Sequence, residues 1–323
     1  DDPVTASQHH LKHGTTSLMP ALYTSMNTQQ YVEAVAILRE AMKKPECANI
    51  AGLYMEGPYL NPKFGCCKED NPWAGRVDRE KYKELIEAGV KLTTSQPAVG
   101  EVMNLFEEAS EESPILHITM GANFSGAYSS ACAVKEMMDD DVKEFITVYE
   151  SGTVCGINWA MVNIAKDMAD KGFSVEEIVK VLDHIKANDR NNMLPQDFAM
   201  VQRGGRVSEE ERKLDPSLNI VPVLAFNEDR SRFVALGVMP SLKPAIERVI
   251  EEFKNTGVDD KYFITIAQSY CMEDAEMAKA MLDEAFPDCS KKIFTLTPVF
   301  TVQSGTRCVS IQAFLDPAKN NLY

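Results

Sequence analysis

The stretch that decides the fold is PILHITMGANFSG, residues 114–126. Its first half is an apolar run typical of a buried strand. Its second half is a polar turn that carries two glycines and leads into the helical periodicity of residues 125–138. A strand that leads into a helix through a short turn is the repeating step of α/β proteins. The start of such a helix offers free backbone N–H groups and partial positive charge, which favour a bound phosphate or carboxylate.

A second polar turn, TTSQP at residues 93–97, also opens a segment with helical periodicity. Ordinary N-capping by Ser and Thr explains either turn taken alone. Because two such turns follow each other within roughly 30 residues, a shared ligand site and simple capping are both left open.

The rest of the chain alternates between helix and strand patterns, with a capping box formed by Ser174 and Glu177. The first group of expected elements is helices 79–88, 97–112, 125–138, 158–171 and 174–187, and strands 115–120 and 145–149. This order predicts a parallel sheet with helices on both faces. The second group is strands 218–226, 233–239, 263–268, 293–296 and 308–314, and helices 240–254 and 273–286. It predicts a second, α+β domain whose first two strands form a hairpin.

Residues 1–75 differ in pattern from the rest of the chain, and a polar loop rich in Asn, Pro and Gly places a boundary near Gly75. A helix beginning at Asn27 is expected to bury Tyr31, Val35, Leu38 and Met42. The nearby residues His9, His10 and His13 indicate a solvated helix end rather than a metal site, because no carboxylate stands beside them.

Composition limits the possible functions. The chain has 323 residues, with 48 acidic and 33 basic side chains and a net charge of −15, which disfavours nucleic acid and anionic membrane surfaces as partners. No apolar run reaches membrane-spanning length. Eight cysteines without a C-x-x-C pair predict a reduced, cytoplasmic protein.

Few residues suggest catalysis. The sequence supports no Ser-His-Asp arrangement and contains no phosphate-binding glycine motif of the known nucleotide-binding types. His117 alternates with apolar neighbours and is predicted to be a packed core residue. Arg203 and Arg206 flank two glycines, where they could hold a phosphate, dock a partner or simply be solvated.

Four motifs resemble the DegV family of fatty-acid-binding proteins over about residues 76–315. They are TSQP at 94–97, FSGAY at 124–128, RGGRV at 203–207 and LNIVPVL at 218–224. The resemblance implies a bacterial, cytoplasmic carrier without enzymatic activity or cofactor. In this family a long-chain fatty acid lies between two α/β domains and is presented to a fatty acid kinase. The resemblance also implies the domain boundaries. The first domain would span residues 76–190 and be incomplete at its N-terminus, and the second would span residues 191–323.

The same resemblance assigns roles to residues of this chain. Arg203 and Arg206 would dock the kinase, and Thr94, Ser95 and Ser125 would bind the carboxylate. Other pocket residues would be Asn123, Gly126 and Gln303. The family often has Ser and Gly at the positions of Ala122 and Asn123, and His at the position of Gln303. Its N-terminal strand with a Thr-Asp-Ser motif is not found in this sequence.

Residues 4–75 instead resemble N-acetylglucosamine-6-phosphate deacetylase, a metal-dependent barrel enzyme. The motifs are HGTTS at 13–17 and EGPYL at 56–60, and in that family Glu56 would be a metal ligand. Its other ligands have no counterpart here, and a catalytic metal needs about three protein ligands. The alternatives to a fatty-acid carrier are therefore a metal-dependent hydrolase fragment and a composite chain without activity.

Overall fold

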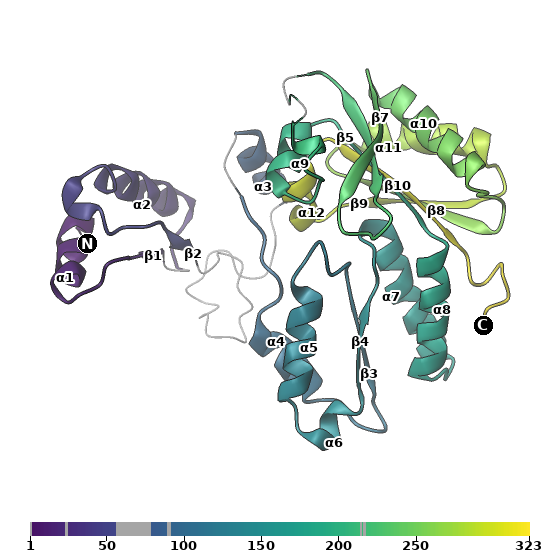
Figure 1. Cartoon of the computed structure of the whole chain (residues 1–323), viewed down its shortest axis with the longest axis horizontal. Coiled ribbons are helices and arrows are strands. Elements are labelled where there is room, and N and C mark those ends of the chain that lie inside the picture. Colours follow the sequence, from purple (N-terminus) through teal and green to yellow (C-terminus); the bar gives the residue numbers. More distant parts are fainter. Residues whose placement is uncertain (1, 23–24, 56–78, 89–91, 214, 216–217) are drawn as a thin grey trace. The chain divides into compact units, whose positions relative to one another are not determined.

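The computed structural model describes residues 2–22, 25–55, 79–88, 92–213, 215 and 218–323. The chain divides into two compact units, residues 1–78 and residues 79–323 (Figure 1). The predicted boundary at Gly75 lies outside the described residues. Within the described part, no helix is both long enough and apolar enough to cross a bilayer.

The first unit is a small arrangement of two helices and a short parallel strand pair. Its elements are α1 (Pro3–Lys12), β1 (Ala21–Leu22), α2 (Thr28–Ala41), the 3₁₀ helix η1 (Pro45–Cys47) and β2 (Tyr54–Met55). Helix α2 begins with a capping box between Asn27 and Gln30, and it buries Tyr31 and Leu38 as predicted. The prediction for Met42 is wrong: its side chain is 43% exposed, because it lies at the C-cap, beyond the last helical turn that packs on the core.

The three histidines of this unit lie on the solvated end of α1. His9, His10 and His13 are exposed, and their neighbours in the described residues form no group of three metal-ligating side chains. The prediction of a solvated helix end is confirmed.

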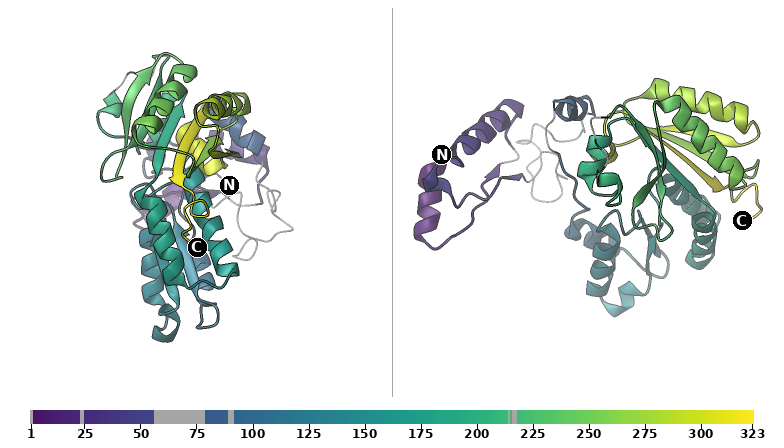
Figure 2. Two further views of the ribbon diagram at one scale, coloured as in Figure 1. Left: turned by 90° about the vertical axis from the view of Figure 1, so that its right-hand side faces the viewer. Right: turned by 45° about the horizontal axis from the view of Figure 1, so that its top comes forward.

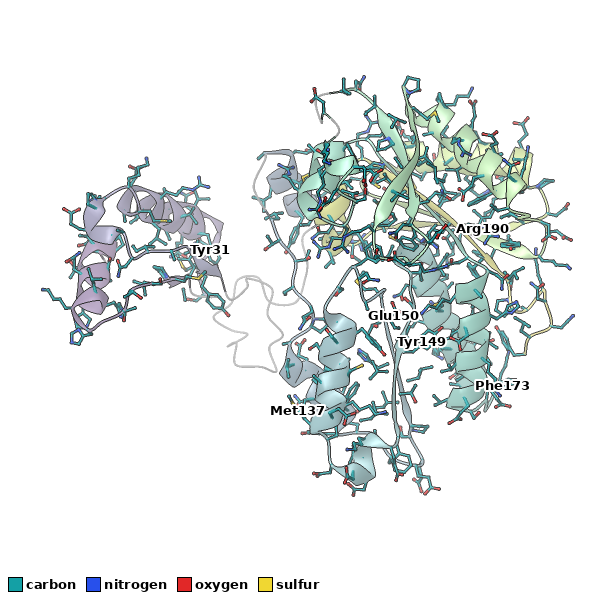
Figure 3. All side chains as sticks on the ribbon, in the orientation of Figure 1. Tyr31, Met137, Tyr149, Glu150, Phe173 and Arg190 are labelled. Carbon is teal, nitrogen blue, oxygen red and sulfur yellow. The ribbon has the colours of Figure 1, made fainter. Side chains whose placement is uncertain are left out.

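The second unit consists of two lobes, of which the first lobe is built around a two-stranded parallel sheet. Its elements are α4 (Val99–Phe106), β3 (Ile115–Thr119), α5 (Ala127–Met137), α6 (Asp140–Lys143), β4 (Ile146–Glu150), α7 (Cys155–Asp170) and α8 (Val175–Ala187). Helices α4 and α5 cover one face, where Phe106, Val134 and Ile146 pack together. Helices α7 and α8 cover the other face (Figure 1). Tyr149, labelled in Figure 3, donates from Oη to Asp183 Oδ1 on α8 at 3.0 Å.

The second lobe is built around a six-stranded sheet in the order β7-β6-β5-β10-β8-β9. Its strands are β5 (Arg190–Pro195), β6 (Val221–Phe226), β7 (Phe233–Met239), β8 (Tyr262–Gln268), β9 (Ser290–Thr295) and β10 (Cys308–Leu315). Helices α10 (Leu242–Asn255) and α11 (Met272–Ala285) cover one face, around Ile264, Ile266 and Ile311. Only β8 and β9 pair in parallel. The predicted hairpin of β6 and β7 is confirmed.

The other face of this sheet packs on α7 and α8 of the first lobe (Figure 2). Phe263 and Phe314 of the sheet join the apolar cluster of those two helices. The buried amide of Gln312 accepts from the backbone N–H of Gly156 at 2.8 Å and donates to Val154 O at 3.0 Å. A side chain in the sheet thus caps the start of α7. The two lobes therefore share one buried interface.

The structure corrects the predicted elements at several places. Helix α4 ends at Phe106 instead of residue 112, and α7 starts at Cys155 instead of residue 158. Strand β5 was not expected, and neither were the short helices α6, η1, α9 (Phe198–Gly204), η2 (a 3₁₀ helix, Glu211–Lys213) and α12 (Pro298–Ser304). Helix α3 (Arg79–Glu87), which was expected, packs on α12. The six described cysteines all carry free thiols.

Candidate functional site

The two polar turns singled out in the sequence lie next to each other in the structure. The Gln96 side chain lies over Gly126, so close that a β-carbon added to Gly126 would be 2.3 Å from Gln96 Oε1. The loop before α4 therefore contacts the loop before α5. This contact meets the geometric condition that a ligand site shared by the two turns requires.

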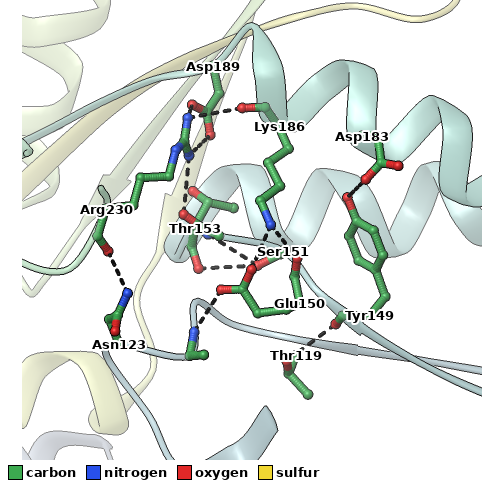
Figure 4. A network of polar contacts seen from close by, with 12 residues as sticks. Thr119, Asn123, Tyr149, Glu150, Ser151, Thr153, Asp183, Lys186, Asp189 and Arg230 are labelled. Atoms are coloured by element: carbon green, nitrogen blue, oxygen red, sulfur yellow. Dashed lines mark hydrogen bonds and ion pairs between the residues drawn. The ribbon is translucent and has the colours of Figure 1, made fainter. Parts of the chain in front are cut away.

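The loop of residues 120–126 is held by backbone hydrogen bonds at the end of the two-stranded sheet. Gly121 N donates to Thr153 O at 2.9 Å, and Ala122 N donates to Glu150 Oε1 at 2.8 Å (Figure 4). Phe124 is buried, with its ring centroid 5.1 and 5.2 Å from those of Phe226 and Phe233 in the β6–β7 hairpin.

A cavity of about 290 Å³ lies between the loop before α4 and helices α9 and α12. Its apolar wall is made by Leu92, Met200 and Val302, which belong to or pack against one buried cluster. Its polar lining is Thr93, Thr94, Arg203, Gly204, Arg206 and Gln303. An apolar wall beside a hydrogen-bonding rim suits a ligand with one polar end and one apolar end.

The polar side of the cavity is a chain of hydrogen bonds. Gln303 Nε2 donates to Thr94 Oγ1 at 3.0 Å, and Arg206 Nη1 donates to Gln303 Oε1 at 3.3 Å. Arg206 also donates from Nε to Phe124 O at 3.3 Å, which links the cavity to the loop of residues 120–126. A β-carbon on Gly204 would lie 2.8 Å from Gln303 Oε1, so a larger residue here would displace the Gln303 amide.

Four of the predicted site residues, Thr94, Arg203, Arg206 and Gln303, line this cavity. Three others do not line it and lie in the adjoining loops. The exposed Ser95 follows Thr94, and the half-buried Ser125 accepts from Ala127 N at 3.2 Å just before α5. Gly126 is the N-cap of α5.

Asn123, another predicted position, does not line the cavity. Asn123 is exposed and donates from Nδ2 to Arg230 O at 3.4 Å. Glu56, the residue of the deacetylase resemblance, lies outside the described residues. Arg203 is exposed, and its guanidinium contacts the sulfur of Met200.

Sequence reasoning missed the apolar wall of the cavity. Met200 and Val302 lie on α9 and α12, two helices of seven residues each, and such short segments show little periodicity. Arg230 was also missed, because it stands in a polar turn that carries no other sign of function.

His117 is half-buried in β3 and packs against a buried neighbour, so the predicted core position is met only in part. Its ring meets that of Phe106 edge to face, with centroids 5.4 Å apart, and burial lowers the pKa of the imidazole. In the described part of the chain, no three His, Cys, Asp or Glu side chains converge on a metal position.

The fold and the site define an α/β protein of two lobes with an amphipathic cavity beside paired helix starts. The chain belongs to the DegV family: the family model described as "Uncharacterised protein, DegV family" matches residues 71–316. The structure thus confirms the predicted DegV-like α/β fold. The family match begins at residue 71, and the comparisons do not support the deacetylase resemblance of residues 4–75.

Individual relatives agree with this assignment. A DegV domain-containing protein of Staphylococcus aureus is 25% identical over 238 residues, covering 73% of this chain and 83% of that protein. Among solved structures, DegV, a fatty acid binding protein from Bacillus subtilis, is 26% identical with a TM-score of 0.60, covering 73% and 83% of the two chains. The Streptococcus pneumoniae Fatty Acid Kinase (Fak) B3 protein, loaded with linoleic acid, is 20% identical with a TM-score of 0.66, covering 74% and 84%.

Proposed function

We propose that this protein binds a long-chain fatty acid in the second unit and presents it to a fatty acid kinase, without being an enzyme itself. The observation that carries the proposal is the cavity with Leu92, Met200 and Val302 on one side and Thr94 and the Arg206–Gln303 pair on the other. The names of the Bacillus subtilis and Streptococcus pneumoniae proteins support this ligand class.

The chemistry of the cavity fits a carboxylic acid with an acyl tail. A carboxylate accepts hydrogen bonds, and Thr94, Gln303 and Arg206 carry the hydroxyl, amide and guanidinium donors for it. Hydrogen bonds to a charged group contribute roughly 1.5–3 kcal/mol. Each buried CH₂ adds about 0.8 kcal/mol, so an apolar channel contributes most of the affinity for a long chain.

The remaining predicted residues take secondary roles in this proposal. Ser125, Gly126 and Asn123 lie at the start of α5, where backbone N–H groups favour an anion. Ser95 lies beside Thr94. These four would form a second rim for the carboxylate when the Gln96 side chain moves off Gly126.

The kinase partner would meet the cavity at its exposed rim. Arg203 is exposed beside the opening, and Arg206 stands behind it with a half-buried side chain. On a chain of net charge −15, these two guanidinium groups are a local site for an acidic surface or a phosphate. We place the complex in the cytoplasm and divide the carrier at residues 76–190 and 191–323.

The test is binding of a defined fatty acid to delipidated protein, preceded by lipid extraction and mass spectrometry of the protein as purified. Thr94→Ala removes a rim hydroxyl and should weaken binding about tenfold, because one hydrogen bond to a charged group is lost. Thr256→Ala is the matched control: its hydroxyl bonds Glu252 O at the end of α10, outside the cavity. A protein that carries no lipid from a lipid-replete host and binds none afterwards would refute the proposal.

For residues 4–75 we propose that the deacetylase resemblance reflects a composite chain rather than a second activity. In the described part of this segment no metal-ligating group of three is present. Bound zinc or iron in the purified protein, together with release of acetate from an N-acetylated sugar phosphate, would contradict this view and favour the hydrolase.

A further inference from the structure

At the tip of the β6–β7 hairpin, Arg230 joins the hairpin to the first lobe, and Arg232 beside it donates from Nη1 to Asn123 O at 3.4 Å. Arg230 forms a two-pronged ion pair with Asp189, in which Nη1 lies 3.0 Å from Oδ2 and Nη2 contacts Oδ1 (Figure 4). The same guanidinium donates to Gly152 O at 3.2 Å and Lys186 O at 3.0 Å. The Asp189 side chain is only 1% exposed, so its carboxylate is shielded from solvent, while the Arg230 side chain is 28% exposed.

The backbone of Arg230 is as specific as its side chain. Its φ is 54°, in the left-handed region that non-glycine residues seldom adopt. Such a conformation persists only when the surroundings hold it in place. Here the surroundings are the turn bond from Arg230 N to Asn227 O, at 3.0 Å, and the four contacts of the guanidinium.

The network around Arg230 reaches the loop of residues 120–126 at two consecutive positions. The Arg230 carbonyl accepts from Asn123 Nδ2 at 3.4 Å. One residue earlier, Ala122 N donates to Glu150, whose carboxylate is paired with Lys186 at 2.6 Å. Lys186 in turn offers its carbonyl to the Arg230 guanidinium, so two of the contacts that hold the loop lead to Arg230, one through its main-chain carbonyl and one through its side chain (Figure 4).

The charges of the network fit this role. Burial would raise the pKa of Glu150, but hydrogen bonds from Lys186 and from the Ala122 N–H outweigh it and hold that pKa below its usual value. Burial would also lower the pKa of Arg230, and the Asp189 carboxylate reverses that effect. The groups are therefore held charged and paired, which keeps the geometry of the loop fixed.

We propose that Arg230 is a positioning residue for the acid-binding loop. From its position in the hairpin, Arg230 holds residues 122 and 123 in place. It thereby orients Ser125 and the start of α5 toward the ligand without contacting the ligand itself. This inference rests on the proposed function, because the fatty acid of that proposal is the ligand whose carboxylate the fixed loop would bind.

The test removes the network without leaving a buried charge unpaired. The double variant Arg230→Gln/Asp189→Asn replaces both charged partners by amides, since Arg230→Gln alone would leave Asp189 buried and unpaired. The matched control is Arg248→Gln/Glu251→Gln, an ion pair on α10 in which Glu251 is 66% exposed. Fatty-acid affinity and amide hydrogen exchange are measured for all three proteins.

The double variant should bind the fatty acid about tenfold more weakly, equivalent to roughly 1.4 kcal/mol. Amides of residues 121–127 should exchange faster, while those of β8 and β10 exchange as in the unmodified protein. The control should match the unmodified protein in both measurements. Unchanged affinity, or weaker binding without faster exchange in this loop, would overturn the inference.

The failure of the proposed function would look different. In that case the unmodified protein binds no fatty acid, and the exchange measurement still decides whether Arg230 fixes the loop. Slow exchange of residues 121–127 in the double variant would then overturn the positioning role as well.

Discussion

The two sheets of the second unit differ in how completely they are covered. In the six-stranded sheet, Ile264, Ile266 and Ile311 are fully buried. In the two-stranded sheet, four of the five residues of β3 are only half-buried, although helices lie on both faces. A parallel pair of strands is usually part of a wider sheet that buries its strands on both faces.

We interpret this difference as a dependence of the first lobe on the second for its stability. Two strands alone are marginal in water. Here they are supported by α7 and α8, which also pack on Phe263 and Phe314 of the larger sheet. We therefore expect changes at the shared interface to cost more than changes within the smaller sheet.

The largest effect is expected at Gln312, which joins the sheet to the start of α7. Gln312→Leu should lower the free energy of unfolding by about 3 kcal/mol or more, because the Gly156 N–H and the Val154 carbonyl lose their buried partner. Urea unfolding measures this loss. Gln196→Leu, which removes a partly buried bond to Asp274, should cost only about 1 kcal/mol. Equal losses of unfolding free energy in the two variants would show that the interface between the lobes contributes no more stability than a partly buried bond elsewhere.

Matched isoleucines compare the two sheets directly. Ile266→Ala in β8 should cost about 3 kcal/mol, because the side chain is fully buried and leaves a cavity. Ile118→Ala in β3 should cost about 2 kcal/mol, since its side chain is only half-buried. The same unfolding measurement applies to both variants. A larger loss at Ile118 would contradict the dependence of the first lobe on the second.

Glu150 gives the smaller sheet a sensitivity to acid. Its pKa is lower in the folded protein than the usual 4.5, so its contribution to stability is present above about pH 4.5 and is lost as the pH falls further. Glu150→Gln should reduce stability by a constant amount above that pH, and the difference should shrink below it. Unfolding midpoints recorded from neutral to acid pH test this. A difference that does not change with pH would rule out the carboxylate as the cause.

The smallest effect is expected at His117. Burial lowers the pKa of its imidazole below the usual 6.5, so the folded protein resists protonation and loses stability as the pH falls below that value. His117→Gln should make stability less dependent on pH between about 7 and 5. If the pH dependence in that range is the same in the variant, the imidazole does not cause it.

Much of the fold could be predicted from local signals. The capping box of Ser174 and Glu177 and the β6–β7 hairpin follow from residue type and periodicity, and both are present. Strand β5 was not predicted because Asn191 and Asn192 read as a polar loop. Both are buried: Thr153 and Gln312 donate to the amide oxygen of Asn191, and Asn192 donates to Glu252 of α10. The local sequence pattern of residues 190–195 does not indicate that partners from distant parts of the chain are present.

The candidate site, too, could be predicted only in part from the sequence. Thr94, Arg206 and Gln303 were identified through a family resemblance, and they lie together in the structure. Arg230 depends on contacts with residues 41 to 78 positions away in the chain, so its role can be seen only after folding.

Gly156, at the start of α7, determines which parts can move against each other. A β-carbon at this position would lie 2.3 Å from Thr265 Oγ1 and 2.6 Å from Thr265 Cβ, so the helix lies on the larger sheet with no room between them. Thr265 is β-branched and cannot turn aside easily. Helix α7 must therefore travel with the larger sheet as one rigid piece. If a fatty acid enters as proposed, we expect its passage to open at the Thr93–Pro97 loop, where the flexible end of Gln96 lies over Gly126.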